Sequence, residues 1–182
     1  MDNTADNIFR IISFAAFTLT IAAVALHFVF HRSKGTKSPE VKEIIKFKLI
    51  SLKTFKILIF IAVSFCIIVL IITGFFPNLI LFQTISGYWL ILHVTIAVPF
   101  IFCMVLLALT YAEQFSSKKY PFLVKATFWL LILLALPLIL SIVLSMFPLF
   151  GTYGQELLAE IHRYSALLLS MIAILHCYLS FG

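Results

Sequence analysis

Apolar residues run in five long stretches, separated by short breaks that are polar or carry glycine and proline. As a helix, each stretch is long enough to cross a bilayer hydrocarbon core, which takes about 20 residues. The five expected spans are Ile11–Phe30, Ile57–Phe76, Ser86–Thr110, Leu123–Phe147 and Leu157–Phe181. The pattern therefore predicts an all-α membrane protein, a bundle of five transmembrane helices.

Composition supports this fold class. Of the 182 residues, 63% are hydrophobic and only 11% are charged, a balance that soluble domains do not have. The segment Met1–Asn7 carries two aspartates and no basic residue, which argues against a cleaved signal peptide. The three cysteines form no CxxC pair, so neither a zinc knuckle nor covalent haem attachment is encoded.

The basic residues predict the orientation of the bundle. Eleven of the 13 lysines and arginines lie in two segments, His31–Lys56 and Lys118–Lys125, and only Arg10 and Arg163 lie at the other ends of the spans. Basic residues concentrate on the cytoplasmic side of membrane proteins. We therefore expect the N-terminus outside and the C-terminus in the cytoplasm.

The first basic segment has a pattern of its own. Ser38-Pro39-Glu40 resembles a helix start, and apolar residues then alternate with lysines up to Lys56. This indicates an amphipathic helix on the cytoplasmic interface, attracted by anionic lipid, with a docking site for a partner as the alternative. Binding to nucleic acid is not expected, because no recognition motif accompanies the charge. Residues 1–56 thus form an N-terminal span with a basic segment, and residues 57–182 form a four-helix core.

All five histidines lie within the expected spans or directly at their ends. His162 and His176 are fourteen residues apart in the last span, so they are separated by about 21 Å and lie within roughly 40° of the same helix face. His93 lies about two turns into the third span, and His27 and His31 lie at the inner end of the first. Depth therefore pairs His93 with His162, and His27 or His31 with His176.

Such pairs predict haem binding. Ionisable side chains in membrane spans usually face the bundle interior and mark a path for protons, ions or electrons. An imidazole in the membrane needs partners for both ring nitrogens, and a haem iron and a backbone carbonyl satisfy both. Iron held by two histidines has no open position and passes electrons. We expect one haem b at the outer pair, and a second at the inner pair.

Other residues near these histidines fit a macrocycle. Ala97, Ala166 and Ala173 lie three or four residues from a histidine, although small residues also serve ordinary helix packing in membranes. Arg163, next to His162, is a candidate partner for haem propionates, or else an interfacial anchor.

These residues resemble those of the bacterial di-haem b-type cytochromes that are membrane subunits of formate dehydrogenases, nickel–iron hydrogenases and thiosulfate reductases. The resemblance covers Ile57 to Phe181. It rests on Ile72-Thr73-Gly74, on Gly87 through His93 to Ala97, and on the stretch from Glu160 through Ala166 to His176-Cys177-Tyr178. It implies that the last helix binds two haems and that His93 is the partner of His162.

One feature departs from that family. Its members usually have a histidine at the cytoplasmic start of the helix that corresponds to Ile57–Phe76, where this chain has Lys53-Thr54-Phe55-Lys56. His27 is the candidate replacement, with His31 as the second choice. If neither reaches His176, a quinone headgroup or a partner's cofactor is the expected occupant of the inner position. His31, Lys53 and Lys56 are candidate quinone contacts, with interfacial charge as the alternative for both lysines.

The resemblance implies a multi-pass protein of the bacterial cytoplasmic membrane. It would be a cytochrome b subunit that is not catalytic by itself and carries electrons between quinone and a partner redox subunit of the multihaem, iron–sulfur, molybdenum or nickel dehydrogenase type. Two alternatives remain: a histidine-lined metal or proton transporter, and a structural membrane anchor of a larger complex. Carboxylates inside the spans would favour the transporter, yet Glu113, Glu156 and Glu160 lie near span ends.

Overall fold

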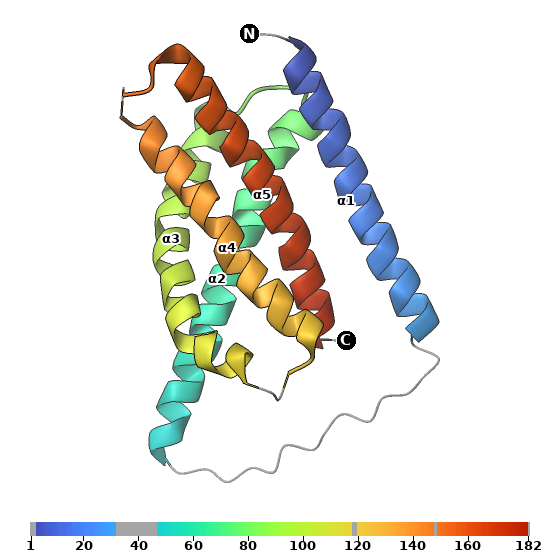
Figure 1. Ribbon diagram of the computed structural model, residues 1–182, viewed down its shortest axis with the longest axis vertical. Helices are drawn as coiled ribbons and strands as arrows, with labels where there is room; N and C mark the ends of the chain where they lie inside the picture. Colours follow the sequence, from blue (N-terminus) through green and yellow to red (C-terminus); the bar gives the residue numbers. More distant parts are fainter. Residues whose placement is uncertain (1–2, 32–46, 118–119, 148, 182) are drawn as a thin grey trace.

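Five long helices make up the part of the chain that the computed structural model describes, residues 3–31, 47–117, 120–147 and 149–181. They are α1 (Asn3–His31), α2 (Phe47–Leu79), α3 (Gly87–Ser116), α4 (Phe122–Ser145) and α5 (Gly151–Phe181), shown in Figure 1. Each contains a segment long and apolar enough to cross a membrane. Within the described ranges there is no strand, so the expected all-α fold with five helices able to span a membrane is confirmed.

Three helices begin well before the expected spans. α1 starts at Asn3, α2 at Phe47 and α5 at Gly151. The apolar pattern marks only the part of a helix that crosses hydrocarbon, whereas backbone hydrogen bonding continues into the polar interface. The second half of the expected interfacial helix, Phe47–Lys56, is the first part of α2 and continuous with the span. The first half of that helix lies outside the described residues.

The helices run side by side, with the N-terminus and the α2–α3 and α4–α5 connections at one end of the bundle (Figure 1). We call this the N-terminal end, and the opposite end, where α5 finishes, the C-terminal end. The closest packing joins α4 to α5 and α2 to α3, while α1 packs against α5 and α2. Helices α2 to α5 thus form a four-helix core, with α1 packed on its side.

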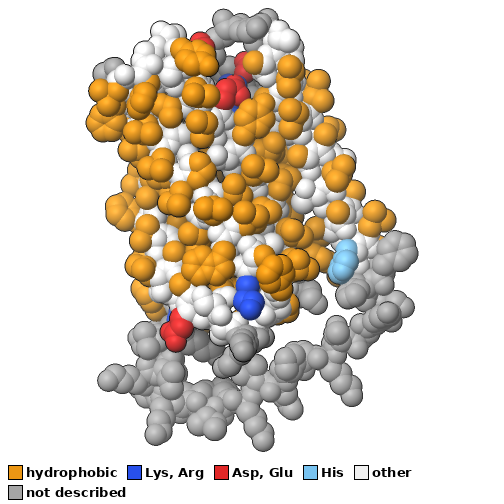
Figure 2. Space-filling view, in the orientation of Figure 1, with side chains coloured by type: hydrophobic (Ala, Val, Ile, Leu, Met, Phe, Trp, Pro, Cys, Tyr) orange, Lys and Arg blue, Asp and Glu red, His pale blue; other side chains and the backbone are white. Residues whose placement is uncertain are grey.

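Packing inside the core is apolar and aromatic. Phe128 of α4 is 1% exposed and stacks on Phe115 of α3, with ring centres 4.3 Å apart. Around these rings pack Ile59 and Val63 of α2. Hydrophobic side chains also cover the outer face along the middle of the helices, and charged groups gather toward the two ends (Figure 2). This surface suits lipid on the outside of the bundle.

Candidate functional site

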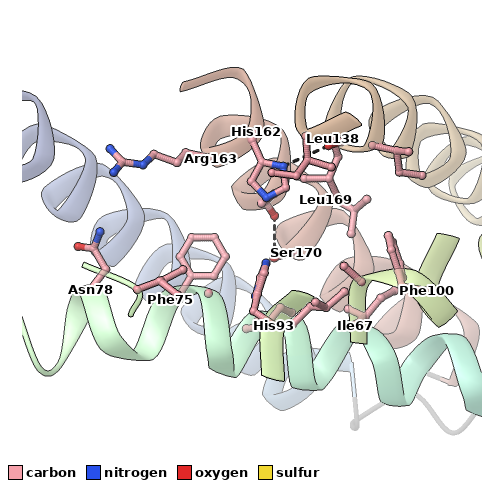
Figure 3. A pocket seen from close by; sticks show the side chains of 18 of the residues that line it. Ile67, Phe75, Asn78, His93, Phe100, Leu138, His162, Arg163, Leu169 and Ser170 are labelled. Carbon is pink, nitrogen blue, oxygen red and sulfur yellow. Dashed lines mark hydrogen bonds between the residues drawn. The ribbon is translucent and has the colours of Figure 1, made fainter. Parts of the chain in front are cut away.

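The fold brings His93 of α3 and His162 of α5 together. Their ring centres are 6.4 Å apart, with the ring planes at 77°. Figure 3 shows the two imidazoles pointing toward one another from opposite sides of a cavity. This is the pair that matched in depth along the sequence.

The protonation of His162 follows from its hydrogen bond. Its Nδ1 lies 3.1 Å from the carbonyl oxygen of Leu138 on α4. A carbonyl only accepts, so Nδ1 carries the hydrogen and donates it. Nε2 of a neutral His162 then presents a lone pair, which is the form that a metal ligand needs.

His93 is held in the same way by a threonine. Its Nδ1 lies 2.9 Å from Oγ1 of Thr73 on α2, and that hydroxyl donates to the carbonyl oxygen of Val69 at 2.8 Å. The hydroxyl has one hydrogen; when it is given to Val69, the hydroxyl accepts from His93 Nδ1–H. In that tautomer Nε2 of His93 also presents a lone pair.

Gly74 gives His93 the room it occupies. A Cβ at this position would lie 3.3 Å from Cε1 and 3.7 Å from Nδ1 of His93. The first contact is tight enough to press on the ring. Thr73 and Gly74 thus act on one imidazole from neighbouring positions, one as a hydrogen-bond acceptor and one by its lack of a side chain.

A cavity surrounds the two imidazoles. It encloses about 1250 Å³ of space not filled by protein atoms, including open space at its mouth, and its wall is mostly apolar. Ala97 and Ala166, the candidate small residues next to His93 and His162, line it, and Arg163 lines it near the N-terminal end. We call it the His162 cavity.

The geometry of the pair fits haem. Metal–imidazole nitrogen bonds are about 2.0–2.1 Å long, and a nitrogen lies about 1.1 Å from its ring centre, so two imidazoles on one iron have ring centres about 6.3 Å apart. The observed 6.4 Å matches that separation. Within the described residues no group of three or more His, Cys, Asp or Glu side chains is arranged to hold a bare metal ion. A haem needs only the two axial ligands.

Arginines lie beside the mouth of the His162 cavity. Arg163 pairs with Asp6 of α1 at 2.8 Å and with Glu160 at 3.4 Å. Arg10 of α1 donates from Nε to the amide oxygen of Asn78, which also lines the cavity, at 2.8 Å. The extra N-terminal helix thus contributes both a carboxylate and a guanidinium to this end of the core.

A second cavity lies toward the C-terminal end, around His176. Its space not filled by protein atoms is about 1440 Å³, including open space outside the wall, and it shares Ile67 of α2 with the His162 cavity, so the two are neighbours in one core. Ala173, the candidate small residue next to His176, lines it. We call it the His176 cavity.

His176 repeats the arrangement of His93. Its Nδ1 lies 2.8 Å from Oγ1 of Thr127 on α4, and that hydroxyl donates to the carbonyl oxygen of Leu123 at 2.9 Å. When the hydroxyl donates to Leu123, His176 donates from Nδ1 and its Nε2 presents a lone pair, with the Ser180 hydroxyl 3.5 Å away.

His27 is not brought to this cavity. It contacts the hydroxyl of Tyr178 through Nδ1 and is not among the described residues that line the His176 cavity. Tyr178 follows His176 by two residues, about 200° around the helix. His27 thus packs against a different face of α5 from the one that carries His176.

The other expected quinone contacts are placed only in part. His31 ends α1 and Lys53 lies in α2, but the side chains of both are outside the described residues. Lys56 places its ammonium 5.6 Å from the ring centre of Tyr111, a residue that lines the His176 cavity. The same tyrosine donates its hydroxyl hydrogen to the Lys56 carbonyl at 3.0 Å.

Several contacts of the histidines do not follow from the sequence pattern. Thr73 and Gly74 enter only through the resemblance, and Thr127 is not among the residues that the pattern singles out. The available signal for Thr127 is that it is a polar residue within the strongly apolar stretch Leu123–Phe147. The Leu138 carbonyl could not be found, because every residue carries one.

Comparisons with protein-family models, with curated proteins and with solved structures gave no match.

Proposed function

We propose that the protein is a transmembrane electron-transfer subunit that binds b-type haem between His93 and His162. The observation that carries the proposal is the opposed pair of imidazoles, both held at Nδ1, with ring centres 6.4 Å apart inside an apolar cavity. Haem bound there supplies a reversible one-electron couple. The protein would position it, exclude water, and tune its potential through Thr73 and the Leu138 carbonyl.

The direction of the bundle in the membrane belongs to the same proposal. The described lysines Lys56 and Lys125 lie in the first halves of α2 and α4, which both begin at the C-terminal end (Figure 1), so the positive-inside rule would put that end in the cytoplasm of a bacterium and the His162 cavity near the outer surface. A partner redox protein would then dock at the N-terminal end and exchange electrons with quinone through this chain. The resemblance to di-haem cytochrome subunits supports such a partner of the multihaem, iron–sulfur or metal-dehydrogenase type.

The test is a reduced-minus-oxidised visible spectrum of the full-length protein, purified after expression with added haem. We expect b-type absorption bands in the wild type, and their loss in His93→Leu and in His162→Leu. His27→Leu is the matched control, because it removes an exposed histidine outside the His162 cavity and should keep the bands. A colourless wild-type protein, or bands that survive both core substitutions, would rule the proposal out.

A further inference from the structure

The His176 cavity carries one imidazole where a second haem would need two axial ligands. Among its described lining residues there is no other histidine and no methionine. Cys177 also lines it, but it follows His176 directly on the same helix and cannot lie across the cavity from it. The residues present therefore do not fit a haem held on both faces.

The polar groups of this cavity instead suit a small ring with carbonyl oxygens. Tyr120 accepts a hydrogen bond from the Gln114 amide at 2.6 Å, and among the residues that the structure describes no acceptor takes its phenolic hydrogen. That O–H is a donor for a carbonyl. Nε2 of His176, which presents a lone pair, is an acceptor for a hydroxyl. A hydrogen-bond donor and a hydrogen-bond acceptor in one pocket match the two redox forms of a quinone. The carbonyl oxygens of the quinone accept hydrogen bonds, and the hydroxyl groups of the quinol donate them.

Aromatic rings line the same part of the cavity. Phe115 lies at their centre, with its ring centre 4.3 Å from that of Phe128, 5.1 Å from Tyr120 and 5.6 Å from His176. Offset aromatic contacts of this kind stabilise a further planar ring. Most of the remaining lining is apolar, as in most small-molecule sites, with Ser64 of α2 as a further polar residue.

The cavity also reaches the surface of the bundle. Ile57 of α2 and Cys177 and Ser180 of α5 line it, and all three are exposed. An opening between α2 and α5 gives an apolar tail a way into the surrounding lipid. A headgroup inside the core with its tail in the bilayer is the arrangement that a membrane quinone requires.

We infer that the His176 cavity binds the headgroup of a membrane quinone in place of a second haem, with Tyr120 and His176 as its hydrogen-bond partners. The inference rests on the proposed electron-transfer function. Reduction of the quinone to the quinol takes two electrons and two protons. The electrons come one at a time through the neighbouring His93–His162 site from the partner redox protein, and the protons come from water at the nearby membrane face.

The experiment uses the full-length protein and decyl-benzoquinone as the probe. Haem is first counted per chain by the pyridine haemochrome assay, and we expect one. The chemically reduced protein is then mixed with the probe, and re-oxidation is followed at the b-type band. We expect saturable re-oxidation in the wild type and a rate at least fivefold lower in Tyr120→Phe and in His176→Leu, each with an unchanged spectrum.

Thr110→Val is the matched control, because Thr110 is also a polar residue near the end of α3 and bonds a carbonyl of its own helix, Leu106. It should leave the rate unchanged. Two haems in the wild type and one in His176→Leu would overturn the inference and leave the proposed function standing. Re-oxidation insensitive to both cavity substitutions would overturn it as well.

A colourless protein would contradict the proposed function, but quinone binding in the His176 cavity could still be tested on it. Equilibrium dialysis of the same protein against decyl-benzoquinone should then show binding that Tyr120→Phe and His176→Leu weaken at least fivefold. No binding, or equal binding by all variants, would overturn the inference.

Discussion

Thr73 and His93 lie on neighbouring helices and share a hydrogen bond of 2.9 Å between Oγ1 and Nδ1. Thr127 and His176 repeat it at 2.8 Å on another pair of helices. In both cases the hydroxyl also lies within hydrogen-bond distance of a carbonyl in the preceding turn of its helix, and when it donates to that carbonyl it accepts from the ring. Threonine thereby sets the tautomer of each imidazole and aims Nε2 into a cavity.

Thr73→Val tests this role with little change in shape. The methyl group that replaces the hydroxyl cannot accept from Nδ1, so His93 loses its orientation and its preferred tautomer. Loss of such an outer partner weakens metal binding by about 10- to 100-fold. We expect haem affinity to fall within that range, measured by titrating haem into the haem-free protein.

Thr95→Val is the control for the threonine substitution. Thr95 is exposed on the same helix as His93 and bonds only the carbonyl of Ile91, according to the described contacts. Its replacement should leave haem affinity unchanged. Equal affinities for the wild type and Thr73→Val would show that the hydroxyl does not position His93.

Gly74→Ala tests the space beside His93. The added methyl group would lie 3.3 Å from Cε1 of His93 and push the ring from its position. In an ordinary helix this change would be stabilising by about 1 kcal/mol, because alanine favours the helix over glycine. We therefore expect a protein that folds at least as well but shows weaker b-type bands, and a larger loss in Gly74→Val. Full bands in both variants would contradict the proposed contact.

The histidines could be found from the sequence, because imidazoles in apolar spans stand out by composition and their spacing sets their depth. Ala97, Ala166 and Ala173 could be selected for the same reason, since each lies within one turn of a histidine, and each lines one of the two cavities. The five spans followed from the apolar pattern alone.

The depth of a residue in the membrane, however, does not determine which neighbouring helix its side chain faces. His27 and His176 lie at corresponding ends of their helices, yet α1 presents His27 to the face of α5 that carries Tyr178. Rotation of one helix about another depends on packing that no single sequence shows. The same limit hid Thr127, because a threonine in a membrane helix usually satisfies its hydroxyl within its own turn, and its second partner depends on which helix it faces.

Charge at the mouth of the His162 cavity should tune the haem potential. Arg163 lines the cavity, and Asp6 and Glu160 compensate its charge at 2.8 Å and 3.4 Å. A positive charge near the iron favours the reduced form. We expect Arg163→Gln to lower the midpoint potential and Asp6→Asn to raise it, each by on the order of tens of millivolts, in a redox titration. Shifts of the same sign would refute this electrostatic account.

The buried hydroxyl of Ser13 gives a prediction about stability. Ser13 of α1 is 0% exposed, and its Oγ has no hydrogen-bond partner among the residues that the structure describes. An unsatisfied buried polar group costs about 1–3 kcal/mol, so Ser13→Ala should leave the unfolding temperature in detergent unchanged or raise it.

Ser170→Ala is the matched comparison, because Ser170 is 2% exposed and donates to the Ala166 carbonyl at 2.7 Å. The Ser170→Ala variant should lose about 0.5–1.5 kcal/mol of unfolding free energy and unfold at a lower temperature than the wild type. A loss in Ser13→Ala as large as that in Ser170→Ala would mean that Ser13 is satisfied in the membrane, by water or lipid.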